Sequence, residues 1–307
     1  MKHAIIFCVE KGFLEDQCRL LLQSYQQFAQ DPNIDLIACS PRPDNRPTPE
    51  MAAELQAAGV IHMTQALNQD FLDYPIANKL LCCAHVEKHH PEYASYLFTD
   101  TDTVWLNPIG HLHAEPGLYL KPVGHKGPGT SGAQDPMDTY WQQVFALFDL
   151  PMPAVDVQTT IELIPIRGYY NAGYIWANQL DGFFQQWLAD FKRLHQAGLV
   201  PPGFVSKDGN NFRCLDQVAL AVTVARHDQH RKELPVPYNY HLPFRPMMPA
   251  QRRCALSELV HVHYHKWFQH PDFLDHVTVD EEKASAQYQW LKQRLPLQPI
   301  TGGPFKC

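Results

Sequence analysis

Two aspartates separated by one residue, Asp100 and Asp102, have the clearest capacity for chemistry in this sequence. They follow an apolar run at residues 96–98 and precede a second one at 104–106. Two carboxylates at positions i and i+2 can approach the same cation, and Mg²⁺ and Mn²⁺ prefer oxygen ligands and keep positions open for phosphate oxygens. The alternative is an ordinary turn, in which Asp and Thr are common. Because burying two carboxylates without a cation is costly, the flanking apolar runs favour a metal site.

Three histidines alternate along residues 259–264 and just beyond, at His261, His263 and His265. If this segment is a strand, the three side chains share one face. Imidazole suits first-row metals, so one of these histidines could complete an Asp, Asp, His site. The adjacent Lys266 could neutralise a phosphate. Surface histidine is the alternative in a chain that contains 17 histidines, and the alternation favours the metal site.

Weaker signals come from polar residues in the middle of the chain. Asn171 precedes Ala172 and Gly173, a small pair that lets the backbone approach a ligand closely, although a tight turn is the simpler explanation. Its amide could bind ligand hydroxyl groups. Asp216 and Gln217 begin a predicted helix, where an aspartate is usually a cap, and they could instead bind a substrate.

Alternating strands and helices position the acidic pair. Apolar runs predict strands at residues 4–9, 34–39, 59–62 and 96–98, and apolar periodicity predicts helices at 14–29, 49–58 and 75–89. This alternation implies a mostly parallel sheet, in which ligands bind beyond the carboxyl ends of the strands. Asp100 and Asp102 lie at that end of their strand.

The second half of the chain has a different pattern of predicted elements, with longer loops and connections. We predict a loop at residues 124–138, strands at 159–166, 174–177 and 259–264, helices at 141–148, 183–195, 216–225 and 280–294, and a proline-rich connection at 235–249. The expected fold is therefore an α/β, Rossmann-like domain over residues 1–307, with a mostly parallel central sheet flanked by helices and a loop-rich second half.

Composition narrows the function classes. The net charge of −7, without a dominant Lys/Arg cluster, argues against a nucleic-acid partner. The sequence has no apolar run near the ~18 residues of a membrane span and no signal-peptide pattern. Its eight cysteines are scattered without a CxxC motif, which is typical of reduced thiols. These features predict a cytoplasmic protein.

The run LFTDTDTVW at residues 97–105 resembles the DxD strand of GT-A glycosyltransferases. Asn171-Ala172-Gly173, Asp216-Gln217 and a late histidine followed by Lys266-Trp267 occur in the order seen in the family-eight enzymes, which resemble glycogenin and galactosyltransferases. The resemblance spans residues 4 to about 268. In that family a glycine follows the histidine and a proline stands between the lysine and the tryptophan, and this sequence lacks both.

The resemblance implies a metal-dependent transfer of a sugar from a nucleotide-diphosphate donor, commonly UDP-linked, with Mn²⁺ or Mg²⁺. It implies a single GT-A domain, with a nucleotide-binding half at residues 1–110 and an acceptor-binding half at 111–307. We expect donor-binding residues at Val9, Lys79, Asp100, Thr101, Asp102 and Lys266, metal ligands at Asp100, Asp102 and His263 with His261 next in order, and catalytic residues at Asp216, Gln217 and Asn171.

Two other functions remain open at this point. Nucleotidyltransferases share the parallel sheet and the metal, but they carry an early glycine-rich, basic loop, whereas residues 9–13 contain a single glycine. A catalytically inactive scaffold that binds a sugar or nucleotide is the non-enzymatic alternative. The sequence leaves the acceptor open among glycans, proteins and small molecules.

Overall fold

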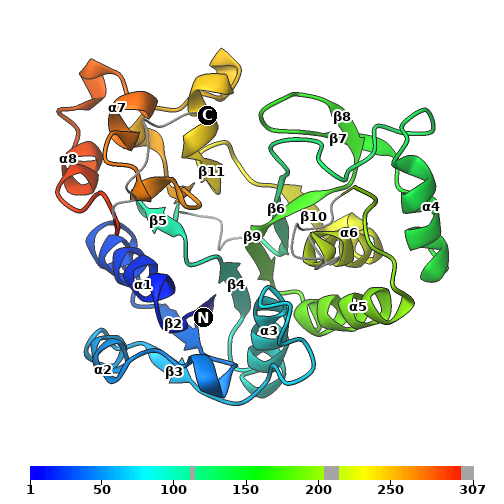
Figure 1. Ribbon diagram of the computed structural model, residues 1–307, viewed down its shortest axis with the longest axis horizontal. Helices are drawn as coiled ribbons and strands as arrows, with labels where there is room; N and C mark the ends of the chain where they lie inside the picture. Colours follow the sequence, from blue (N-terminus) through cyan, green and yellow to red (C-terminus); the bar gives the residue numbers. More distant parts are fainter. Residues whose placement is uncertain (111–114, 204–213, 299–307) are drawn as a thin grey trace.

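A seven-stranded sheet forms the centre of the protein (Figure 1). The computed structural model describes residues 1–110, 115–203 and 214–298. The strands lie in the order β10-β6-β9-β4-β1-β2-β3. Their bounds are β1 His3–Cys8, β2 Ile34–Cys39, β3 Ile61–Met63, β4 Ser95–Thr99, β6 Gly117–Pro122, β9 Tyr170–Asn178 and β10 Arg231–Glu233.

Most neighbouring strands of this sheet are parallel. The pairs β1–β2, β1–β4, β2–β3 and β6–β10 run in the same direction, whereas β9 runs antiparallel to both β4 and β6. The predicted α/β fold with a mostly parallel central sheet is therefore confirmed. The carboxyl ends of β1, β2 and β4 meet at one edge, which is where the sequence predicted a site.

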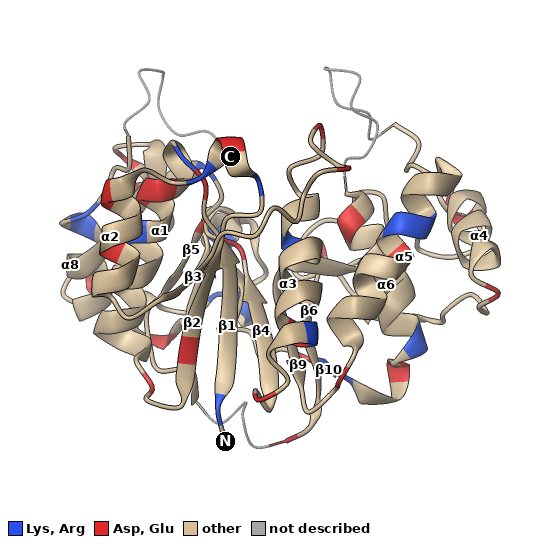
Figure 2. Ribbon diagram, turned by 90° about the horizontal axis from the view of Figure 1, so that it is seen from below, with Lys and Arg blue, Asp and Glu red and all other residues tan. Residues whose placement is uncertain are grey.

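Helices cover both faces of the sheet (Figure 2). Along β1, Ala4 and Ile6 belong to the core shared with α3, α5 and α6, whereas Ile5 and Phe7 belong to the core shared with α1 and α2. This alternation explains why consecutive residues from Ala4 to Phe7 are all apolar, rather than every second one. The helices are α1 Phe13–Ser24, α2 Pro49–Ala57, α3 Ala77–His89, α4 Asp138–Leu147, α5 Phe183–Ala197, α6 Leu215–Arg226, α7 Phe273–Val277 and α8 Ala286–Lys292. In the described ranges, none of the helices is long and apolar enough to cross a membrane.

A second, three-stranded sheet holds the C-terminal part against the first half of the chain. Its order is β11-β12-β5, with β11 Tyr240–His241, β12 His261–His263 and β5 Thr103–Trp105. Beyond it, α8 lies beside α1 (Figure 1), and Trp290 of α8 packs edge-on against Phe28 at 5.6 Å between ring centroids. The C-terminal segment thereby places β12 next to the turn that follows β4.

Several elements differ from their predictions. Residues 159–164 connect a two-stranded hairpin, β7 Val155–Gln158 and β8 Pro165–Arg167, so the predicted strand at 159–166 is wrong. The predicted strand at 174–177 begins earlier, at Tyr170, so Asn171 to Gly173 lie within β9 rather than in a turn. The predicted helix at 280–294 is divided into a 3₁₀ turn at Asp280–Glu282 and α8.

Candidate functional site

The turn between β4 and β5 carries Asp100 and Asp102 and is anchored to three other strands. The Asp100 backbone N–H donates to the Gly173 carbonyl at 3.0 Å, and the Thr101 hydroxyl donates to the Cys8 carbonyl. The Tyr264 N–H donates to the Asp102 carbonyl at 3.1 Å. β1, β9 and the segment after β12 therefore fix the orientation of the two carboxylates, whose side chains are each 24% exposed.

His263 is the histidine that faces this pair. β12 pairs antiparallel with β5 and places His263 opposite Thr103. The His263 Nε2 atom lies 3.2 Å from Asp102 Oδ1 and 3.9 Å from Asp100 Oδ2. Ligand atoms of Asp100, Asp102 and His263 all lie within 4.8 Å of one another, which is a suitable separation for three ligands of one cation.

His261 and His265 occupy different surroundings. His261 is buried, its Nε2 lies 3.0 Å from Thr99 Oγ1, and its ring packs edge-on against Trp105 and Tyr174. His265 follows the strand in a left-handed conformation at φ 53°, and its Nδ1 lies 3.7 Å from Asp102 Oδ2. The alternating histidines therefore do not line up as three equal ligands of the acidic pair.

Lys79 links the acidic turn to Asp216. It projects from α3, and its Nζ lies 2.8 Å from Asp100 Oδ1 and 3.7 Å from Asp216 Oδ2. The same ammonium group donates to the Ala172 carbonyl at 3.3 Å. Asp216, in the first turn of α6, also accepts a 3.1 Å hydrogen bond from the Tyr74 hydroxyl. Lys79 thus lies between carboxylates from two distant parts of the chain, Asp100 and Asp216.

Charge interactions set the pKa values in this group. Burial raises the pKa of Asp100, with the Lys79 charge acting in the opposite direction. Burial also opposes ionisation of Asp102, but the neighbouring His263 outweighs it and lowers the pKa of that carboxyl. For Lys79 and His263, burial disfavours the charged form, yet the adjacent carboxylates outweigh it and raise both pKa values. Lys79 and His263 therefore offset the negative charge of the neighbouring carboxylates.

A cleft of about 330 Å³ opens directly onto these residues. Its lining residues are Cys8, Glu10, Leu14, Gln17, Pro75, Ile76, Asn78, Lys79, Phe98, Asp100, Thr101 and Asp102. Glu10 and Asn78 are site residues that the sequence analysis missed. Glu10 forms an ion pair with Arg42 and accepts from the Asn78 amide at 3.0 Å. The sequence signal for Glu10 was its position two residues after the end of β1, at the carboxyl edge of the sheet.

Four other predicted residues, Val9, Asn171, Gln217 and Lys266, do not line this cleft. Val9 is fully buried and does not line it, because its backbone N–H and carbonyl are bonded to Cys39 and Ser40. Gln217 is half-buried next to Asp216, and the Lys266 side chain is exposed. Asn171 accepts from the Gly173 N–H at 2.8 Å and from the Asn239 amide at 2.9 Å.

The absence of a side chain at Gly173 leaves room for the His263 ring. A Cβ atom at this position would lie 2.5 Å from His263 Cε1 and 2.8 Å from Nδ1. The close approach anticipated for the Ala-Gly pair is therefore made to a histidine ring of the protein itself.

We expect Gly173→Ala to weaken binding of Mn²⁺ by about 10- to 100-fold, because the buried His263 ring must move away from Asp102. The added methyl group is also expected to cost ~1–3 kcal/mol of stability. Isothermal titration with Mn²⁺ and urea unfolding measure the two effects. In Gly168→Ala, where the new Cβ meets the Tyr170 hydroxyl at 3.0 Å, stability should fall while Mn²⁺ affinity stays at the wild-type value. Equal Mn²⁺ affinity in both variants would contradict the role of Gly173.

Comparison with known proteins identifies a family to which the chain is similar. The sequence model of a family described as Rhodobacterales glycosyltransferase domain matches residues 5–228. That range contains Lys79, Asp100, Asp102 and Asp216 but ends before His263. None of the curated proteins matches the chain.

Among solved structures, the chain is similar to one described as the apo structure of the bifunctional glycosyltransferase WbbM, with 14% sequence identity and a TM-score of 0.56. The match covers 96% of this chain and 52% of the other. The chain therefore spans about half the length of that structure, and the likeness shows a shared fold.

Proposed function

Because the chain belongs to the family of Rhodobacterales glycosyltransferase domains, we propose that it transfers a sugar from a nucleoside-diphosphate donor, UDP-linked, in a metal-dependent reaction. The observation that carries this proposal is the convergence of Asp100, Asp102, His263 and Lys79 beside one cleft. We further propose a GT-A arrangement similar to family eight, on the basis of the DxD run at the end of β4.

The donor diphosphate is assigned to the carboxyl edge of β1 and β4. Asp100, Asp102 and His263 would hold the cation, since two carboxylates and an imidazole form a suitable ligand set for Mn²⁺. A bound divalent cation supplies positive charge to the diphosphate as the bond to the sugar breaks. Lys79 lines the cleft and adds a second positive charge, which we assign to it rather than to the exposed Lys266.

The transferred sugar and its acceptor are assigned to the side of the cleft where Asp216, Gln217 and Asn171 lie. Lys79 is within reach of both Asp100 and Asp216, so these two carboxylates flank the same ammonium group. Asp216 is held by Tyr74 and Lys79, which orients it to accept a hydrogen bond from a sugar or acceptor hydroxyl.

A thermal-shift panel of UDP, GDP, CDP and ADP, with and without Mn²⁺, tests this proposal. We expect UDP to raise the Tm only when Mn²⁺ is present, because ligand and cation bind the folded state together. Release of UDP from UDP-sugars, measured by a coupled assay, reports turnover without a known acceptor. A shift with UTP accompanied by release of pyrophosphate would instead indicate a nucleotidyltransferase, and no shift with any nucleotide would indicate a scaffold.

A further inference from the structure

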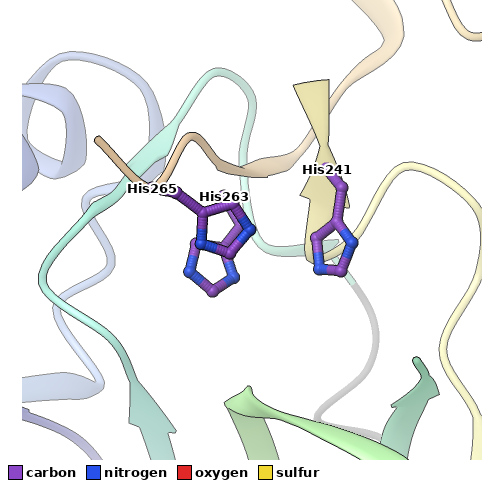
Figure 3. A group of neighbouring side chains, drawn as sticks. All are labelled: His241, His263 and His265. Carbon is purple, nitrogen blue, oxygen red and sulfur yellow. The ribbon is translucent and has the colours of Figure 1, made fainter. Parts of the chain in front are cut away.

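Three imidazole rings form a group of their own beside the acidic pair (Figure 3). His241 comes from β11, His263 from β12 and His265 from the residues that follow β12. The His263 and His265 ring centroids are 4.0 Å apart, and the His241 ring lies 5.5 Å from each of them. One nitrogen from each ring lies within 4.8 Å of the other two, so the three nitrogens are close enough to bind one cation.

Two of these rings are buried with nitrogens that have no hydrogen-bond partner. His241 is 6% exposed and its Nε2 is unpartnered, and His263 is 2% exposed and its Nδ1 is unpartnered. A buried polar atom without a partner costs free energy, and such atoms require an explanation such as an ion or an ordered water. His265 is half-buried at the edge of the group, which leaves a path from solvent.

The backbone holds the rings of His241 and His263 in place. β11 and β12 are parallel and pair His241 with His263, so both side chains leave the sheet on the same side. Each ring then rests against a glycine. A Cβ at Gly124 would lie 3.1 Å from His241 Nδ1, and one at Gly173 would lie 2.8 Å from His263 Nδ1. Ligands fixed in this way need little reorganisation to bind a cation.

The kind of ligand also indicates which metals the group would bind. A set of three nitrogens is suited to Zn²⁺, Co²⁺ or Ni²⁺ and poorly suited to Mg²⁺.

We propose that His241, His263 and His265 bind a divalent transition metal such as Zn²⁺, at a second site that overlaps the acidic one. The two sites share His263, and a neutral imidazole offers one lone pair, so His263 serves one site at a time. Zinc at the histidine site therefore removes a ligand from the Asp100–Asp102 site. This competition rests on the proposed function, whereas the histidine site itself does not.

The site is tested with the full chain by titrating Zn²⁺ calorimetrically and by recording the visible absorption of bound Co²⁺. We expect one tight Zn²⁺ per chain, with affinity reduced about 100-fold or more in His241→Gln, because that variant loses a ligand. His265→Gln changes a half-buried residue and should show the same loss in a chain that folds normally. Circular dichroism of both variants checks the fold.

Two control variants distinguish zinc binding at the three histidines from zinc binding elsewhere on the protein. His85→Gln/His89→Gln removes a histidine pair at helical spacing, whose rings are 4.4 Å apart and which could bind Zn²⁺ on the surface of α3. Asp102→Asn removes the acidic site and leaves the three histidines intact. We expect both variants to retain the tight Zn²⁺, with Asp102→Asn losing Mn²⁺-dependent binding of UDP.

Zinc binding that is insensitive to His241→Gln and His265→Gln, or that is lost in either matched variant, would overturn the histidine site. If zinc binds as proposed but no nucleotide binds with Mn²⁺, the histidine site stands and the proposed glycosyl transfer fails. If both hold, Zn²⁺ should release Mn²⁺ from the wild type, seen as the return of the free Mn²⁺ signal in electron paramagnetic resonance. Zinc that binds without releasing Mn²⁺ would overturn the competition.

Discussion

Replacing Asp102 with asparagine is expected to lower the rate of UDP release from a UDP-sugar by about 10³-fold, equivalent to ~4 kcal/mol of transition-state stabilisation. Asp102 is the carboxylate closest to His263, so these two side chains lie together in the proposed ligand set. Asparagine keeps the size of the side chain and its carbonyl oxygen but removes the charge. The coupled assay for UDP measures the rate, and calorimetric titration measures Mn²⁺ affinity.

Asp149→Asn provides the matched control for Asp102→Asn. Asp149 is exposed, lies just beyond α4, and has a φ of 53°, a conformation that asparagine also tolerates. This control makes the same change in net charge, so its rate and Mn²⁺ affinity should equal those of the wild type. An Asp102→Asn variant that folds normally and releases UDP at the wild-type rate would remove Asp102 from the proposed mechanism.

The parts of the fold that follow local patterns could be predicted from the sequence. The buried strands β1 and β4 contain continuous apolar runs, and β2 is apolar except at Asp35. The helices α3 and α5 show a helical period. These strands and helices were therefore located closely. β6 was missed although it is a central strand. It contains Lys121 and Pro122, residue types that argue against a buried strand, and the Lys121 ammonium donates to the carbonyls of Pro235 and Val236. No local pattern reveals such distant partners.

The candidate site, like the fold, could be predicted only where local sequence patterns determine it. The acidic pair was visible because it follows an apolar strand, whereas the position of Lys79 depends on how α3 packs on the sheet. The family resemblance implied that Lys79 binds the donor, but no local pattern indicated that its side chain is 12% exposed and lies between Asp100 and Asp216. The three histidines share a face only while the chain stays extended, and His265 leaves the strand at a positive φ. The partners of each histidine therefore depend on tertiary contacts that periodicity does not contain.

Lys79→Met is expected to lower the free energy of unfolding by ~3–5 kcal/mol when no divalent cation is present, because it leaves Asp100 and Asp216 without their shared positive charge. Methionine fills a similar volume and can keep the contact with the Phe98 ring, over which the ammonium lies at 5.3 Å. Urea unfolding in a metal-free buffer measures this loss. Mn²⁺ should then raise the Tm of the variant by more than that of the wild type, since the cation restores charge where lysine is missing.

Lys232→Met is the control for loss of an ordinary lysine. Lys232 pairs with Glu115 at 2.7 Å on the surface of the protein, so its removal should change stability little and should leave the Mn²⁺ effect on Tm unchanged. Asp102→Asn combined with Lys79→Met distinguishes binding at the acidic site from binding elsewhere, because the additional stabilisation by Mn²⁺ should disappear in the double variant. An equal Mn²⁺ effect in Lys79→Met and the wild type would show that the cation does not approach Asp100. In that case Lys79 would be a structural counter-ion of the two carboxylates, and the positive charge for the diphosphate would have to come from another group.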